Sequence, residues 1–189
     1  MPETESSFIL LDYTVLSIFA AVLAIDFLGS LYNGRAFVCE AVWHELKSAM
    51  DNDCLDSLLW LPTQTVFQAN GQPSDVGWLQ FADSQVNPND DIVELKRSLS
   101  YQKRFVRGRA ESLAICSNRN WIFACDDSAA RRFARKKGIR LTSSIAILVK
   151  ATKLEILDEH KADRIHARMI DLGYSSPLSY QYGISSYLK

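Results

Sequence analysis

Acidic residues at four positions of this chain could act together on a substrate: Asp12, Glu45, Glu111 and Asp127. Asp12 directly follows the apolar run 8–11, and Asp127, with Asp126 beside it, follows the apolar run 121–125. Carboxylates at the carboxyl ends of buried strands commonly form sites for hard divalent cations in α/β proteins. The pattern therefore predicts a divalent-cation site at one edge of a sheet.

Each of these acids also has an ordinary structural interpretation. Asp12 could cap a helix that begins near Val15, and Asp127 could cap the helix that follows it. Glu111 could favour the positive end of its own helix dipole, and Glu45 could be an exposed helix residue. Taken one at a time, the acids do not establish a site.

Strand-like and helix-like segments alternate along the chain. Short apolar runs predict strands at 8–11, 36–39, 78–82, 121–125 and 139–141. Helices are predicted at 15–32, 40–50, 54–61, 91–100, from 108 onward, and at 128–137, 145–151 and 158–172, with a loop over 68–75. This alternation predicts an α/β fold with a parallel sheet and right-handed crossovers.

The chain's length and composition favour one domain, with room for a small appendage. It has 189 residues, 48% of them hydrophobic, which is ample for a packed core. Its formal net charge is −1. A polyanion such as RNA would therefore have to bind a local basic patch, because no global field attracts it.

The sequence predicts a cytoplasmic protein without a membrane segment. The uncharged stretch 13–25 is shorter than the roughly 20 residues that span a bilayer. It follows the acidic residues Glu3 and Glu5, whereas a signal peptide has a basic start. The four cysteines form no CxxC pair and are interpreted as reduced thiols, three of them in apolar stretches.

Basic residues form two clusters that flank the acids in sequence. The first lies within 96–109 and the second within 131–140. They could bind RNA phosphates beside an acidic site, or simply form solvated helix faces. Arg107 and Arg109 are the strongest candidates for substrate contact, because they enter the helix that carries Glu111.

Several motifs, in this order, resemble those of the PIN domain family of small metal-dependent ribonucleases. Residues 10–16 (LLDYTVL) are similar to the family's opening motif, a strand that ends in Asp-x-Thr/Ser. Residues 42–46 (VWHEL) resemble its second motif, a helical acid followed by Leu. Residues 108–114 (GRAESLA) and 124–132 (ACDDSAARR) resemble two motifs of a VapC-like subgroup, which includes toxins of toxin–antitoxin pairs.

The resemblance implies a fold and an activity. The fold is a three-layer α/β/α sandwich with a mostly parallel sheet, expected over 1–157, with a C-terminal helix and tail over 158–189 that pack on the domain or a partner. The implied activity is endoribonuclease cleavage of RNA with Mg²⁺ or Mn²⁺, and the implied role is that of a toxin that a small antitoxin protein neutralises. A homodimer is also expected.

The resemblance also implies roles for individual residues. The catalytic set is Asp12, Glu45, Glu111 and Asp127. The candidate metal ligands are Asp12 as the central one, Glu111, Asp127 and the neighbouring Asp126, which is also a candidate cap or outer acid. The candidate substrate contacts are Thr14, Arg107, Arg109 and Arg131.

Two departures from the subgroup leave other functions open. Arg109 stands where the subgroup often has Glu, and Cys125 stands where Thr or Ser is usual. They favour a second hypothesis, a PIN-like binding or assembly protein with weak or lost nuclease activity. A third hypothesis makes Asp12 the phosphoryl acceptor of a receiver or phosphatase, although the chain lacks a glycine-rich phosphate loop.

Overall fold

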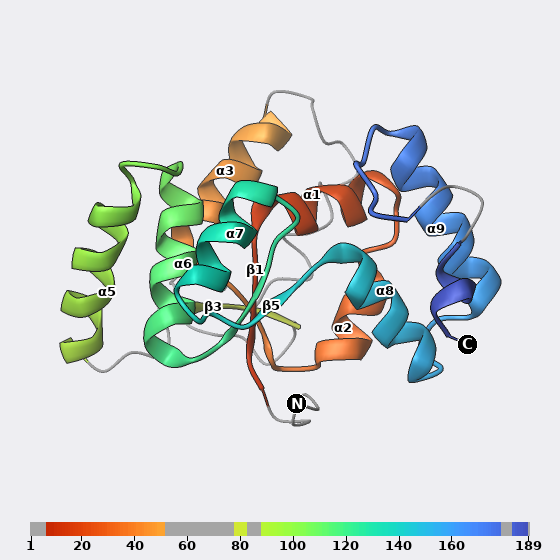
Figure 1. Ribbon diagram of the computed structural model, residues 1–189, viewed down its shortest axis with the longest axis horizontal. Helices are drawn as coiled ribbons and strands as arrows, with labels where there is room; N and C mark the ends of the chain where they lie inside the picture. The colour runs from red at the N-terminus through yellow and green to blue at the C-terminus, as the bar shows by residue number, and fades with distance from the viewer. Residues whose placement is uncertain (1–6, 52–77, 83–87, 179–182, 189) are drawn as a thin grey trace.

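A five-stranded, all-parallel sheet forms the centre of the protein (Figure 1). The computed structural model describes residues 7–51, 78–82, 88–178 and 183–188. The strands are β1 (Ile9–Leu11), β2 (Ala36–Val38), β3 (Leu79–Phe81), β4 (Ile122–Ala124) and β5 (Leu141–Thr142), in the order β3-β2-β1-β4-β5. The predicted α/β sandwich with a parallel sheet is confirmed.

Helices flank this sheet on both sides of β1 (Figure 1). They are α1 (Tyr13–Ala21), α2 (Asp26–Tyr32), α3 (Glu40–Asp51), α5 (Pro88–Tyr101), α6 (Arg107–Arg119), α7 (Ser128–Lys136), α8 (Ser144–Lys153), α9 (Glu159–Asp171) and the short 3-10 helix η4 (Ile184–Tyr187). In the described part of the chain, no helix is long and apolar enough to cross a membrane. The helix predicted over 54–61 and the loop over 68–75 lie outside the described residues.

The three central strands are apolar because both of their faces are covered. Every residue of β1, β2 and β4 is buried. Phe37 of β2 packs against Trp121, just before β4, with ring centroids 4.5 Å apart. Burial on both faces is the usual environment of a parallel strand, and it explains why simple apolar runs predicted these elements.

The single helix predicted over 15–32 is wrong, because the chain turns between α1 and α2. Leu23 has a positive φ of 55°. Its N–H donates to the Ala20 carbonyl at 2.8 Å, and the Ala24 N–H donates to the Phe19 carbonyl at 2.8 Å. These two bonds form a Schellman motif, which ends a helix and reverses its direction.

Helix α9 packs against α8, α1 and η4, and its apolar face joins the common core. Ala162, Ile165 and Met169 on this face are buried together with residues of the sheet and of α8. The C-terminal helix therefore covers the domain. The domain boundary at residue 157 stays a prediction.

Acid should weaken the fold through His166 on α9. His166 is buried, its Nε2 lies 2.7 Å from the Ser176 hydroxyl, and desolvation lowers its pKa, with Asp163 opposing. Above about pH 6.5 the ring is neutral in both states, and below it only the unfolded chain readily takes the proton, so stability falls. Between about pH 7.5 and about pH 5.5 we expect this residue to remove up to about 1 kcal/mol of unfolding free energy.

Urea unfolding of His166→Gln at the two pH values measures this contribution. The variant should lose less stability on acidification than the wild-type protein. His160→Gln, on an exposed position of the same helix, is the matched control and should behave as the wild-type protein does. Identical pH dependence in the wild-type protein and His166→Gln would contradict the prediction.

Candidate functional site

The predicted acids at the strand ends lie next to each other because their strands are neighbours. Strand β1 pairs in parallel with β4, with Leu11 opposite Ala124. Asp12 follows Leu11, and its N–H donates to the Ala124 carbonyl at 3.0 Å. Because the carboxyl ends of parallel strands share one edge, Asp12 and the pair Asp126–Asp127 meet there.

The carboxylate of Asp12 is buried and surrounded by donors. Its residue is 1% exposed. One oxygen, Oδ2, accepts from the Thr14 hydroxyl at 2.9 Å, from the Thr14 N–H at 3.4 Å and from the Cys125 thiol at 3.4 Å. The bond from the Thr14 N–H makes Asp12 the cap of α1, so the same side chain closes the helix and faces the site.

The Cys125 thiol is one of the donors to the Asp12 carboxylate. Burial raises the pKa of Cys125, and the negative charge of Asp12 raises it further. The thiol therefore stays protonated and donates to Asp12, although a thiol is a weaker donor than a hydroxyl. The Thr14 hydroxyl links the same two strand ends, because it also accepts from the Asp126 N–H at 3.2 Å.

The guanidinium of Arg109 lies between Asp12 and Asp127. Its Nη2 is 3.4 Å from Asp12 Oδ2, and its Nη1 is 3.5 Å from Asp127 Oδ2. The Arg109 side chain is only 17% exposed. Desolvation opposes its charged form, but neighbouring negative charge, above all that of Asp12, outweighs this and leaves the pKa of Arg109 above its ordinary value.

The two adjacent aspartates after β4 have different partners. Asp127 caps α7 through Oδ1, which accepts from the Ala130 N–H at 2.7 Å, and turns Oδ2 to Arg109. Asp126 accepts from the Ser144 N–H at 3.0 Å, the Ser144 hydroxyl at 2.5 Å and the Tyr174 hydroxyl at 3.0 Å. Asp126 thus anchors α8 and the segment after α9, while Asp127 faces Asp12.

Burial controls the protonation of Asp126. Desolvation raises the pKa of this carboxyl, and the hydrogen bonds from Ser144 and Tyr174 oppose that rise. Burial likewise raises the pKa of the Tyr174 phenol, with Asp126 adding to the effect, so the phenol remains a donor. The arrangement suits a fixed structural link between helices.

Glu45 of α3 lies near enough to Asp12 and Arg109 for their charges to affect its pKa. Its Oε1 accepts from the Gly108 N–H at 3.1 Å, at the start of α6. Desolvation raises the pKa of Glu45 and Asp12 adds to the rise, whereas the Gly108 hydrogen bond and the charge of Arg109 lower it. The two helices touch so closely that a Cβ at Gly108 would lie 2.8 Å from Glu45 Oε1 and 2.9 Å from Val42 Cγ2.

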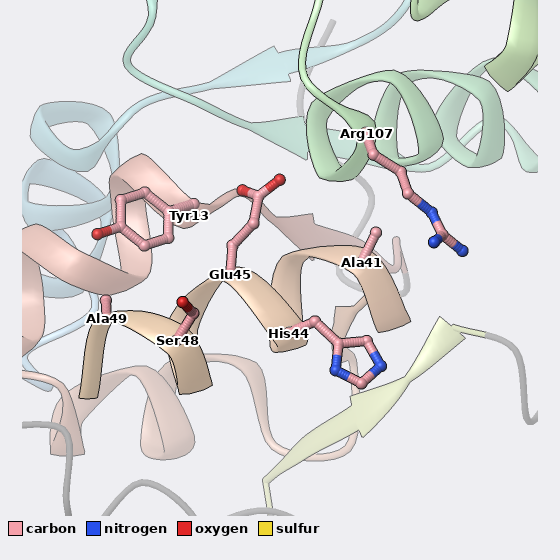
Figure 2. A pocket seen from close by; sticks show the side chains of 7 residues that line it. All are labelled: Tyr13, Ala41, His44, Glu45, Ser48, Ala49 and Arg107. Atoms are coloured by element: carbon pink, nitrogen blue, oxygen red, sulfur yellow. The ribbon is translucent and has the colours of Figure 1, made fainter. Parts of the chain in front are cut away.

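A hollow of about 690 Å³ opens beside Glu45. Figure 2 shows the side chain of Glu45, on α3, between the ring of Tyr13 and Arg107. The ring of His44, the preceding residue, lies on the other side of Glu45 from Tyr13. Arg107 is largely exposed at the start of α6, with 72% of its side chain accessible. The hollow therefore presents an exposed guanidinium and a partly buried carboxylate.

Glu111 lies on a different side of α6 from Arg109. Two residues along a helix turn through about 200°. Glu111 lines a small hollow of about 150 Å³ with Glu94, Ser98 and other residues of α5. It pairs with Arg107 at 3.9 Å. The structure therefore brings Asp12, Asp127 and Glu45 to one region and places Glu111 toward α5; the member of α6 that reaches the aspartates is Arg109.

Arg131, a predicted substrate contact, donates hydrogen bonds to backbone carbonyls of the domain. Its Nη1 donates to the Cys125 carbonyl at 2.7 Å and to the Thr142 carbonyl at 2.5 Å. These bonds connect the chain after β4 to the end of β5. Arg131 thus stabilises the strand ends that carry the aspartates, and its contact with substrate stays a prediction.

The acids do not form an open metal site in this arrangement. Among the described residues, no group of three or more His, Cys, Asp or Glu side chains could hold a metal ion. The chemistry of Asp12 and Asp127 suits Mg²⁺ or Mn²⁺, but both are already bridged by the guanidinium of Arg109. A divalent ion could therefore bind between Asp12 and Asp127 only after the guanidinium of Arg109 moves away.

A parallel sheet with one aspartate after its central strand and another after the neighbouring strand defines an α/β protein with an acidic carboxyl edge. A family model described as a PIN domain matches residues 8–180, so the chain belongs to the PIN domain family. Comparison with curated proteins gives no match. The chain therefore has a nuclease-type fold of a family that generally hydrolyses nucleic acid with divalent ions, and the receiver or phosphatase hypothesis is set aside.

Proposed function

We propose that this protein is an endoribonuclease that hydrolyses RNA phosphodiester bonds at the carboxyl edge of β1 and β4. One observation carries the proposal: Asp12 and Asp127, from neighbouring strand ends, hold a single positive charge between them at 3.4 and 3.5 Å. Two carboxylates that converge on one point support metal-assisted phosphodiester hydrolysis if a divalent ion takes the place of the guanidinium.

Asp12, Glu45 and Arg107 would have different roles in the proposed reaction. Asp12 is rigidly placed by Thr14 and Cys125. Glu45, whose pKa is raised by desolvation, lines a hollow of about 690 Å³, where it would accept a proton from water. Arg107, exposed at the rim of that hollow, would bind a phosphate of the RNA.

A requirement for Mg²⁺ or Mn²⁺ belongs to the same proposal and depends on the position of Arg109. The finer roles rest on the family resemblance: a toxin of a toxin–antitoxin pair, a small antitoxin as partner, a homodimer and a cytoplasmic location.

A second candidate is a PIN-like binding or assembly protein with weak or lost nuclease activity. Arg109 favours it, because a guanidinium stands where the acids would otherwise converge on a metal. The two candidates predict different fates for RNA: the first predicts internal cleavage, and the second predicts binding without cleavage.

The test uses the purified full chain and a fluorescently labelled single-stranded RNA, with DNA of the same sequence as a comparison. We expect internal RNA fragments in the presence of Mn²⁺ and intact RNA in the presence of EDTA. An Asp12→Asn preparation made in parallel reveals any contaminating nuclease. RNA that is bound, as measured by fluorescence anisotropy, but never cut by the wild-type protein would reject the first candidate in favour of the second.

A further inference from the structure

Arg109 is the cation of this site. We infer that its guanidinium occupies the position of a divalent ion between Asp12 and Asp127, so that this one residue controls whether the site can bind metal. This inference concerns the same site as the proposed ribonuclease function. Its effect on RNA cleavage rests on that proposed function. The competition itself follows from the geometry of the described residues.

The competition arises because both cations need the same oxygen atoms. Arg109 contacts Asp12 through Oδ2 and Asp127 through Oδ2. The remaining oxygen of Asp127, Oδ1, already caps α7, and Asp12 Oδ2 also receives the Thr14 and Cys125 donors. A metal ion that bridged the two aspartates would have to displace the guanidinium.

Hydrogen bonds hold the backbone next to Arg109 in place, so the main chain of this residue cannot move away from the aspartates. The preceding Gly108 donates its N–H to Glu45 at 3.1 Å, and its carbonyl accepts from the Cys39 thiol at 3.5 Å. Gly108 also allows α6 to approach α3 more closely than any side chain would permit. Only rotation of the Arg109 side chain can empty the position.

The side chain is held loosely enough to be displaced. Its contacts of 3.4 and 3.5 Å are longer than the 2.7–2.9 Å typical of good charge-assisted hydrogen bonds. Its Nε is buried and has no hydrogen-bond partner among the described residues. By contrast, Arg119 meets Glu94 at 2.8 Å through both Nε and Nη2. Charge, more than directed hydrogen bonding, keeps Arg109 in place.

Removal of the guanidinium would leave an uncompensated acidic site. Asp12 and Asp127 would face each other, and Glu45 would add charge, since the charges of Asp12 and Arg109 both act on it. Carboxylates crowded in this way bind divalent cations and repel each other without one. An acid at position 109 would add one more carboxylate at the same point.

The experiment compares Mn²⁺ binding by the wild-type protein, Arg109→Glu and Arg109→Gln, using isothermal titration calorimetry and thermal melting in EDTA or Mn²⁺. We expect Arg109→Glu to bind Mn²⁺ at least about tenfold more tightly than the wild-type protein, with Arg109→Gln between them. In EDTA, Arg109→Glu should melt at a lower temperature, and Mn²⁺ should raise its melting temperature by mass action. Arg164→Glu, the same charge change at an exposed position of α9, is the matched control and should bind Mn²⁺ as the wild-type protein does.

Equal Mn²⁺ affinity in the wild-type protein and both Arg109 variants would overturn the inference. So would a folded Arg109→Glu protein that binds no Mn²⁺. If Arg109→Glu fails to fold even with Mn²⁺, the neutral Arg109→Gln decides the matter by the same comparison. RNA cleavage is scored separately: a variant that binds Mn²⁺ tightly but cuts no RNA supports the inference and rejects the proposed function.

Discussion

Replacing Glu94 with alanine is expected to lower the free energy of unfolding by about 3–5 kcal/mol, because it strands a buried positive charge. Glu94 on α5 is 7% exposed, and the side chain of its partner Arg119 on α6 is 11% exposed. The carboxylate accepts from Arg119 Nε and Nη2 at 2.8 Å each. It also accepts from Asn118 at 3.2 Å.

Arg119 contacts the sheet region as well as α5, so the loss of stability should be large. Its Nη1 donates to the Ala82 carbonyl just after β3, and its guanidinium lies 5.0 Å from the ring centre of Trp121. Without Glu94, the charge remains buried among these groups with only neutral partners. The packing of α5 on α6 and the start of β4 would all be weakened.

Urea unfolding followed by circular dichroism measures the effect. The double variant Glu94→Leu/Arg119→Met removes both charges and should recover most of the lost stability. Glu40→Ala removes the carboxylate of an exposed pair, in which Glu40 lies 3.6 Å from His44, and should change stability by less than about 0.5 kcal/mol. A loss below about 1 kcal/mol in Glu94→Ala would show that this pair contributes as little as a surface pair does.

The sheet could be predicted from sequence because its central strands are buried on both faces, and burial alone dictates their composition. The turn between α1 and α2 could not be predicted, since its left-handed residue is Leu23 and not a glycine or asparagine. The hydrogen bonds that end α1 come from the backbone, which carries no sequence signal. The Glu94–Arg119 pair was equally hidden, because its partners are 25 residues apart and belong to different helices.

The positions of site residues that follow strands could be predicted from the sequence. The positions of site residues on a helix could not, because the rotation of the helix about its axis is not known from the sequence. Asp12 and Asp127 follow neighbouring strands, so their proximity follows from topology. On α6, however, Arg109 and Glu111 are separated by a turn of about 200° around the helix axis, so they point to nearly opposite sides. Which of them faces the sheet depends on how α6 packs against α3. The close approach of α6 to α3 at Gly108 fixes which side of α6 faces the sheet. In the sequence, this glycine directly before Arg109 was the signal that could have predicted the orientation.

The departures from the family pattern have different physical consequences. Cys125 replaces a hydroxyl but still donates to Asp12 at 3.4 Å, so the orientation of that carboxylate is kept. Arg109 stands where the resembling subgroup often has Glu, and it places a cation between Asp12 and Asp127. We therefore expect metal binding at the proposed site to depend far more on position 109 than on position 125.

Asp12→Asn is expected to reduce Mn²⁺-dependent RNA cleavage by at least about 100-fold, since it removes the central charge on which the proposed hydrolysis depends. The substitution nearly preserves shape. An asparagine oxygen can still accept from Thr14, so the cap of α1 should survive. Arg109 would keep only Asp127 as its charged partner, and the fold should lose about 1–3 kcal/mol.

The measurement pairs initial rates of cleavage with urea unfolding of the same protein preparations. Asp26→Asn, in the exposed first turn of α2, is the matched control and should retain both activity and stability. Cleavage by Asp12→Asn at the wild-type rate would remove Asp12 from the proposed mechanism. Because the expected loss of stability leaves the protein folded, a loss of cleavage in folded Asp12→Asn would reflect the missing charge and not a missing structure.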